Sequence, residues 1–227
     1  MRKFILLTVT ALTLIATQAL AIPNLQLYIP GATYVGETWV TTSNQFELWV
    51  IGNAKFQPIE DVYLAAAYVT GETGTIAITP VGGSTPLALS LSGADGTVPL
   101  LGGGSGLAPH DPWGPGTSWF SYFLGDFTSD ADTIHDYTDG TSDTGTGQIN
   151  KYNVDITGYA SGLHFDAYDH IETGNHTRYI FAPFSHDGES TGGETTTPVP
   201  EPGTVMLLGA GFLSLAIYAK RRQRDNR

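Results

Sequence analysis

The sequence contains no cysteine among its 227 residues. A disulfide framework, a thiolate zinc site and a cysteine nucleophile are therefore all excluded. Charged residues are also scarce, at 14% of the chain, whereas glycine occurs 28 times. Long surface helices rich in lysine and glutamate require more charge than this. The composition therefore favours many short strands joined by turns.

Basic residues are almost missing from the body of the chain. Between residues 22 and 219 the only ones are Lys55, Lys151 and Arg178. The same stretch holds 21 acidic residues, which gives it a formal charge of −18. Such a surface repels phosphate backbones and anionic lipids, so nucleic acid is excluded as a partner. It attracts divalent cations, although an acidic surface that serves solubility alone is the simpler interpretation.

The first 21 residues have the three parts of a secretory signal peptide. Arg2 and Lys3 form a charged start, and residues 4–16 form an apolar stretch diluted by threonine. Ala19 and Ala21 then supply the small side chains that a signal peptidase recognises. We expect cleavage after Ala21. An uncleaved membrane anchor is the alternative, but the apolar stretch is short for a full span.

The last 28 residues, 200–227, combine a short proline motif, an apolar segment and a basic end. The motif Pro200-Glu201-Pro202 follows a Gly/Thr/Pro linker, residues 191–199. Residues 203–219 carry no charge, and as a helix they would be about 25 Å long. The basic stop that follows is Lys220, Arg221, Arg222 and Arg224. Such a tail stays in the cytoplasm and leaves the preceding domain outside, so a plain C-terminal anchor is one interpretation.

This order of parts resembles the PEP-CTERM sorting signal. The matching residues are Pro200, Glu201 and Pro202, then the transmembrane helix 203–219 and the basic tail 220–227. The resemblance implies recognition by an exosortase, which removes the helix in Gram-negative bacteria that make exopolysaccharide and biofilm. It further implies a transient stay in the inner membrane and then a place at the cell surface or in the matrix. It describes a destination and no activity.

Apolar and polar residues alternate with period two in the body, which is typical of half-buried strands. The candidate strands are residues 25–29, 45–50, 62–69, 75–79, 87–91, 118–124, 149–157, 163–168 and 177–181. Turn signals such as Gly82-Gly83-Ser84 separate them. Nine to eleven short strands in one domain, residues 22–190, predict an all-β antiparallel β-sandwich of jelly-roll type.

The two ends of this body are similar to those of an ectodomain family called choice-of-anchor N. The similar segments are residues 22–32, Ile-Pro-Asn-Leu-Gln-Leu-Tyr-Ile-Pro-Gly-Ala, and residues 181–187, Phe-Ala-Pro-Phe-Ser-His-Asp. Members of that family share a body and carry alternative C-terminal sorting signals. The resemblance implies an exported domain that works outside the cell, and it assigns no chemistry to single residues.

One stretch, residues 126–143, is dense in carboxylates. These are Asp126, Asp130, Asp132, Asp136, Asp139 and Asp143. Hard oxygen ligands at this density in a flexible loop are what calcium prefers, so the first four are a candidate Ca²⁺ site. The glycine and the terminal glutamate of an EF-hand are missing. An acidic solvated loop is the simpler alternative.

A second candidate is the predicted strand 163–168 and the residues after it. His164, Asp166, Tyr168 and His170 would share one face, which could hold a metal ion or an acid–base pair. At the rise of a strand, His164 and His170 lie ~20 Å apart, too far to share one ion. Only His164 and Asp166 are close enough to cooperate, and ordinary outward-facing polar residues are the alternative. The pair His186-Asp187 and His176 stand isolated.

A third candidate is the proline-rich loop that carries His110, Asp111 and Trp113. A tryptophan on a loop of a β-sandwich can stack on a sugar ring while a carboxylate binds its hydroxyls. A tryptophan that caps the core is the alternative.

No nucleophile elbow, phosphate loop or His-Glu-x-x-His motif occurs in the sequence, so no residue is assigned a catalytic role. We therefore expect a non-catalytic structural or glycan-binding module associated with exopolysaccharide or biofilm. Its expected partners are a signal peptidase and an exosortase during export, and afterwards exopolysaccharide. A secreted polysaccharide hydrolase and a calcium-dependent adhesin are the alternatives, since carboxylate pairs assemble in space rather than in sequence.

Overall fold

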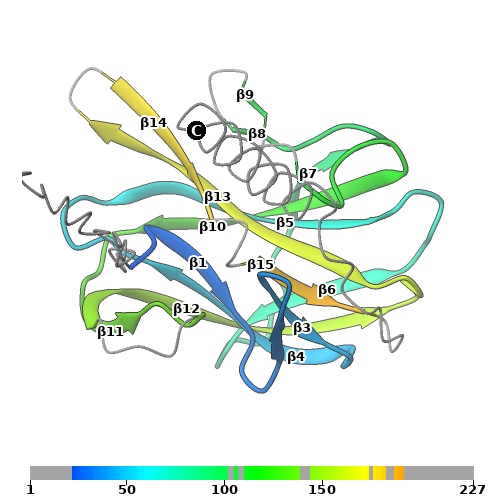
Figure 1. Ribbon diagram of the computed structural model, residues 1–227, viewed down its shortest axis with the longest axis horizontal. Coiled ribbons are helices and arrows are strands. Elements are labelled where there is room, and N and C mark those ends of the chain that lie inside the picture. The colour runs from blue at the N-terminus through cyan, green and yellow to red at the C-terminus, as the bar shows by residue number, and fades with distance from the viewer. Residues whose placement is uncertain are drawn as a thin grey trace, which may run out of the picture.

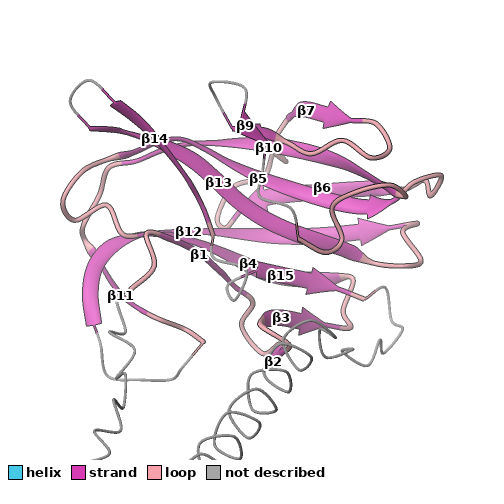
Figure 2. Ribbon diagram, turned by 45° about the horizontal axis from the view of Figure 1, so that its top comes forward, coloured by secondary structure: helices cyan, strands magenta, loops and turns pink. Residues whose placement is uncertain are grey.

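The computed structural model describes residues 22–101, 105–106, 110–138, 144–173, 176–182 and 187–191. For strand residues 101, 105–106, 170–173 and 176–181 it describes the backbone alone. Every regular element in these residues is a strand (Figure 2). The expected signal peptide 1–21 and sorting segment 200–227 lie outside the described residues. Within the described part of the chain, no helix is long and apolar enough to cross a membrane.

A five-stranded antiparallel sheet forms one layer (Figure 1). Its strands, in spatial order, are β1 (Leu25–Tyr28), β4 (Gln45–Gly52), β12 (Thr144–Thr157) and β11 (Asp132–His135). A fifth strand, β6 (Thr75–Pro80), also pairs with β12.

An eight-stranded sheet forms the other layer. Its spatial order is β2 (Thr33–Val35), β3 (Thr38–Thr41), β15 (Asp187–Ser190), β13 (Leu163–Thr173), β5 (Ile59–Val69), β10 (Thr117–Phe127) and β7 (Leu89–Gly93). The strand β14 (His176–Phe181) pairs with β13, and a separate small pair joins β8 (Leu100–Leu101) to β9 (Ser105–Gly106). The ladder between β15 and β3 is parallel, and the other ladders are antiparallel.

The main core lies between the two sheets. Because successive side chains of a strand point to opposite faces, the inward row of each sheet is apolar. Leu27 and Leu48 from the five-stranded sheet pack in one cluster with Leu64, Phe127 and Phe165 from the eight-stranded sheet. All five side chains are fully buried. This two-layer packing confirms the all-β sandwich, while the jelly-roll connectivity stays a prediction.

All nine predicted strands exist, although their ends differ by several residues in places. The largest differences are at β12, which begins at Thr144 and not at residue 149, and at β13, which ends at Thr173 and not at residue 168. The structure also corrects the expected flexible acidic loop, because Asp132–His135 is strand β11 in register with β12. Ile134 is fully buried in that strand, which explains why the segment is held against the sheet.

A second, smaller apolar cluster covers the outer face of the eight-stranded sheet. Its buried members are Ala65, Ala67, Trp113, Trp119 and Tyr168. The two alanines lie on the central strand β5, where their small side chains leave room for the indole rings above them. The Trp119 indole N–H donates to Thr97 Oγ1 at 3.1 Å, so its polar atom is satisfied. These side chains therefore form a second buried region on the outer face of the sheet.

Candidate functional site

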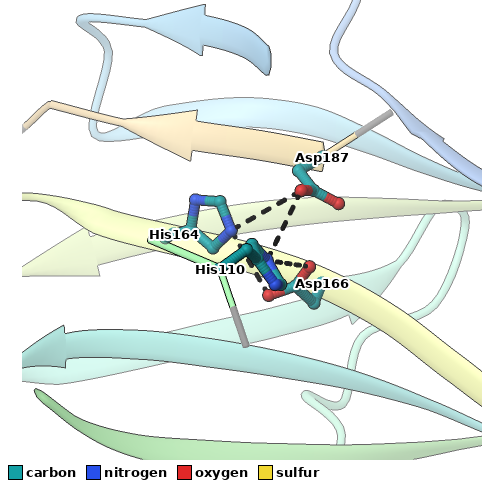
Figure 3. Close-up of side chains that lie close together, drawn as sticks. All are labelled: His110, His164, Asp166 and Asp187. Carbon is teal, nitrogen blue, oxygen red and sulfur yellow. Dashed lines mark hydrogen bonds and ion pairs between the residues drawn. The ribbon is translucent and has the colours of Figure 1, made fainter. Parts of the chain in front are cut away.

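A group of two histidines and two aspartates lies beside this second apolar cluster. Strand β13 contributes His164 and Asp166, whose side chains point away from the main core. Their neighbours on β5 in register are Ala67 and Ala65, whose small side chains leave space for the polar groups on this face of the sheet. Asp187 at the start of β15 and His110 complete the group, which we call the His–Asp cluster (Figure 3).

Strand pairing brings the two carboxylates face to face. Strand β15 pairs with β13 antiparallel, with Glu189 opposite His164 and Gly188 opposite Phe165. Continuing this register by one residue sets Asp187 opposite Asp166. Directly opposed like charges destabilise a sheet, so this pair requires a compensating positive charge or a proton.

A tight turn holds His110 over the sheet. The backbone N–H of Trp113 donates to the His110 carbonyl at 2.8 Å, and Thr117 Oγ1 donates to the Pro112 carbonyl at 2.6 Å. The Trp113 indole packs in the second apolar cluster, and its N–H donates to Asp166 Oδ2 at 2.7 Å. The tryptophan therefore fixes both the turn that carries His110 and the orientation of the Asp166 carboxylate.

The four side chains converge on one point. Both histidines present Nε2 to the carboxylates: His110 Nε2 lies 3.2 Å from Asp166 Oδ1 and 3.7 Å from Asp187 Oδ2. His164 Nε2 lies 3.3 Å from Asp166 Oδ2 and 3.8 Å from Asp187 Oδ2. One donor atom from each of the four residues falls within 4.8 Å of all the others.

The cluster is withdrawn from solvent. The side chains of Asp187 and Asp166 are 1% and 2% exposed, and those of His164 and His110 are 10% and 11% exposed. Burial and the negative charge of Asp166 raise the pKa of Asp187 well above its usual value. Burial opposes ionisation of Asp166 too, but the charge of His164, together with the hydrogen bond and charge of His110, holds its pKa below the usual range. One carboxylate is therefore stabilised as an anion and its neighbour is not.

A second candidate site is a group of aromatic side chains on the outer face of the five-stranded sheet. There the Tyr28 ring stacks on Tyr137 at 4.4 Å between centroids and meets Trp49 edge-on at 5.3 Å. Lys151 Nζ lies 4.0 Å from the centre of the Trp49 ring. We call Tyr28, Trp49 and Tyr137 the aromatic surface. All three are only partly buried.

Polar side chains continue this face along strands β4 and β12. In register, Lys151 stands opposite Trp49, Asn153 opposite Glu47, and Asp155 opposite Gln45. The last two pairs line an open groove. The Gln45 amide donates to Asp155 Oδ2 at 2.7 Å, and the Trp49 indole N–H donates to Glu47. An aromatic ring thus borders rows of amide and carboxylate groups, which are hydrogen-bonding partners for hydroxyls.

Comparison with known proteins bears on the C-terminal segment. The family model of the PEP-CTERM protein-sorting motif matches residues 198–222. That motif implies export and sorting to the cell envelope or surface, with recognition by an exosortase. The match covers these residues and leaves the body unassigned, so the resemblance to choice-of-anchor N stays a prediction.

A search of the curated proteins found no match to this chain. Among solved structures, one similar chain is the crystal structure of ACE19, the collagen-binding subdomain of Enterococcus faecalis surface protein ACE. It shares 10% identity over 75% of this chain and 98% of its own length, with a TM-score of 0.26. At that score the likeness supports no conclusion about fold or ligand.

The structure brings together some of the residues predicted from the sequence. His164 and Asp166 are in contact, as their spacing on one face predicted. His110 joins them, but the neighbouring Asp111 is exposed and outside the cluster. Trp113 is buried, which favours a packing role over stacking on a sugar. Sequence reasoning left Asp187 as an isolated partner of His186, which lies outside the described residues.

The four aspartates of the candidate calcium site do not form one group of ligands, and three of them accept hydrogen bonds from different parts of the chain. Asp126 Oδ1 accepts the backbone N–H of Asp61, and Asp132 Oδ2 accepts that of Ile149. Asp136 Oδ1 accepts the N–H and the hydroxyl of Thr138 within its own turn. Asp130, on the segment before β11, shares no metal-ligand group with them among the described residues. Asp139 and Asp143 lie outside the described residues, and the calcium site stays a prediction.

The aromatic surface is the feature that sequence reasoning missed. Its signal was present, because Trp49 alternates with the inward residues Leu48 and Val50 and so belongs to the outward, polar row of β4. A large aromatic residue in an outward row is the informative exception to the pattern. Tyr137 comes from a segment 88 residues away, about which the pattern of β4 says nothing.

Proposed function

We propose that this chain is an exported, non-catalytic module of the cell surface or extracellular matrix that binds glycan through the outer face of its five-stranded sheet. The PEP-CTERM match at residues 198–222 supports the destination. The observation that carries the binding role is the placement of Trp49 beside the paired polar residues of β4 and β12. The proposed setting is the exopolysaccharide or biofilm of a Gram-negative bacterium, as the resemblance of the tail implies.

The chemistry of this face suits a neutral or cationic sugar chain. A sugar ring offers an apolar C–H face to an aromatic ring and hydroxyls around its edge. The Lys151 ammonium over Trp49 lies on a flexible stem, so a sugar can take its place at low cost. Glu47, Asn153 and Asp155 then provide acceptors and an amide for the hydroxyls of the following units. The formal charge of the body disfavours strongly anionic glycans.

Trp49→Ala is expected to weaken binding to a matched polysaccharide at least tenfold, because buried aromatic anchors dominate the affinity of such surfaces. The measurement is a glycan array followed by affinity electrophoresis with the best polysaccharide, using the processed protein recovered from culture. Phe56→Ala is the matched control, since Phe56 is 88% exposed and also carries a lysine, Lys55, over its ring at 5.4 Å. That variant should bind as the natural protein does.

Equal binding by the Trp49 and Phe56 variants would contradict the proposed surface. An array with no bound glycan would leave the structural role in the matrix as the whole function. Release of reducing sugar from a bound polysaccharide would identify a hydrolase instead, so one experiment separates the binder, the scaffold and the enzyme.

Replacing Pro200, Glu201 and Pro202 with alanine is expected to leave the protein at full length in the inner membrane. Prolines keep this junction extended, and a processing enzyme needs extended backbone in its cleft. Mass spectrometry of the protein from membranes and from the medium measures the outcome. If the natural protein reaches the medium with its Arg227 end intact, removal of the tail is refuted.

A further inference from the structure

We propose that His110, His164, Asp166 and Asp187 bind one divalent first-row transition-metal ion, with zinc as the best fit. Imidazole nitrogen and carboxylate oxygen are both ligands of such ions. The glycan surface lies on the other sheet of the sandwich, so this site is independent of the proposed function.

The distances within the His–Asp cluster match a tetrahedral ion. Zinc bonds to imidazole nitrogen and carboxylate oxygen are about 2.0–2.2 Å long, so the ligand atoms of a tetrahedron stand ~3.3–3.6 Å apart. The two histidine Nε2 atoms lie 3.2 and 3.3 Å from different oxygens of Asp166, and 3.7 and 3.8 Å from Asp187 Oδ2. With one ligand atom taken from each residue, the four atoms lie within 4.8 Å of one another. The ligand atoms would have to approach one another by up to about 1 Å, which is within the reach of side-chain rotation.

The ion also balances the charge of the cluster. Two carboxylates carry two negative charges, and neutral imidazoles add none, so one divalent cation makes the centre electrically neutral. Two adjacent carboxylates in an apolar surrounding are otherwise costly to keep ionised. The ion relieves this repulsion where Asp187 stands opposite Asp166, and it does so without protonating either group.

Two buried polar atoms in the cluster have no hydrogen-bond partner. They are His164 Nε2 and Asp187 Oδ1, on side chains that are at least nine-tenths buried. Buried polar atoms in native proteins are almost always satisfied, so two such atoms on neighbouring side chains point to a missing ligand. His164 Nε2 faces both carboxylates, which is the direction in which a shared ion would lie (Figure 3).

With four protein ligands, the site has the closed coordination of a structural metal centre and not the open position of a catalytic one. Four protein ligands complete a tetrahedron, which leaves no open position for water or substrate. The Trp113 N–H supports the Asp166 carboxylate from outside, as neighbouring donors do around metal ligands. The ligands come from the turn at His110, from β13 and from β15, so the ion joins the last strand of the body to the middle of the sheet.

Calcium is a poor match to the same residues. It takes six to eight oxygen ligands at about 2.3–2.6 Å, and imidazole nitrogen is not among its preferred donors. Half of the donors here are nitrogen. The ion choice therefore separates this site from the calcium site predicted at Asp126–Asp136, which consists of carboxylates alone.

The full chain, stripped of metal with a chelator that is then dialysed away, tests the proposal. Isothermal titration with Zn²⁺ is expected to give one ion per chain. At a free zinc concentration a hundred times Kd, the melting temperature should rise by roughly 5–10 °C, because the ion binds only the folded state. Ca²⁺ at the same concentration should leave the melting temperature unchanged.

His164→Gln and Asp187→Asn are expected to weaken zinc binding at least a hundredfold while keeping side-chain size, since loss of outer-shell partners alone costs 10–100-fold. His135→Gln is the matched control, because that histidine stacks on Tyr137, away from the cluster. It should retain the affinity of the natural protein. X-ray absorption of the zinc-loaded natural chain supplies a readout that does not depend on the variants folding, with two imidazoles in a shell of nitrogen and oxygen.

Three outcomes would overturn the site. One is unchanged affinity in both His164→Gln and Asp187→Asn, and another is a zinc shell without imidazole. The third is a melting curve that no transition metal shifts, which would identify the cluster as histidine–aspartate ion pairs only. A rise with Ca²⁺ alone would favour the acidic stretch before β12 and would also contradict this proposal.

Discussion

Replacing Phe127 with alanine is expected to lower the free energy of unfolding by about 3–5 kcal/mol. The Phe127 ring is fully buried at the end of β10 and belongs to the core between the sheets. It lies over Gly52 of β4 so closely that a Cβ built there would stand 2.5 Å from the ring, with Ile59 at 3.0 Å. Because Gly52 has no side chain to fill the space that the ring occupies, removal of the ring leaves a cavity. Urea unfolding of the full chain, followed by tryptophan fluorescence, measures the loss.

Phe123→Ala is the matched control for this variant. Phe123 lies on the same strand but is 43% exposed, and its ring contacts Tyr63 at 5.1 Å between centroids. Its removal should cost about 1 kcal/mol, the value of an exposed aromatic pair with a modest buried area. Equal losses in the two variants would contradict the face-to-face packing of the sheets. An overall stability of about 5–15 kcal/mol makes the expected difference easy to resolve.

Gly162→Ala is expected to lower the free energy of unfolding by roughly 3–5 kcal/mol. Losses of this size have few causes, and steric overlap and backbone strain are two of them. Gly162 has a φ of +86°, which disfavours any residue with a Cβ. A Cβ at this position would also overlap the Ser190 carbonyl oxygen and stand 2.8 Å from Thr191 Cα. Both contacts are with backbone, so no side chain can rotate away. Strand β15 must shift to admit the methyl group.

Gly71→Ala separates the two causes. Gly71 has a φ of +96°, but nothing lies within 4 Å of a Cβ built on it. Its substitution should cost about 1–2 kcal/mol through backbone strain alone. Hydrogen exchange provides the second measurement: the Thr191 amide, which donates to the Thr41 carbonyl at 3.0 Å, should exchange faster in Gly162→Ala and not in Gly71→Ala. Unchanged exchange in both would show that β15 does not depend on this close approach.

The sequence predicts the strands whose apolar residues face a core, and for a physical reason. In β4 and β13 one face is buried and the other is polar, so the alternation is visible in the residues themselves. Strand β15 has the sequence Asp-Gly-Glu-Ser, which contains no apolar residue and has the composition of a turn. Its place comes from pairing with β13 on one side and β3 on the other. Such a strand is specified by its neighbours and not by its own pattern.

The His–Asp cluster could be predicted only in part for the same reason. His164 and Asp166 are two residues apart on one strand, so the period of a strand predicts their contact. Asp187 reaches them through the register of β15, and His110 through a turn fixed by Trp113. Neither relation is local in sequence. The spacing along β13 could not supply these distant partners.

Trp113 and Trp49 show that residue type alone does not decide whether a tryptophan is buried. The proline-rich loop around Trp113 left open both a ring that stacks on a sugar and a ring that caps the core, and the ring packs with Ala65 and Ala67 in the second apolar cluster. A loop tryptophan is buried when the sheet beneath it is lined with small residues. Trp49, in an ordinary strand, remains at the surface because its row of β4 faces outward. The environment of each ring depends on the residues across from it.

The last strand of the body has a consequence for the order in which the chain acquires its structure. Among the described residues, strands β2 and β3 pair with the eight-stranded sheet only through β15, which is inserted between β3 and β13. Residues 33–41 are synthesised before residues 187–190, so the early hairpin cannot pair with β15 until that later segment is present. Contacts of such long range form slowly and late. This part of the sheet is thus completed late, and a chain that stops short of Asp187 leaves both an open edge on β13 and a hairpin without its strand partner.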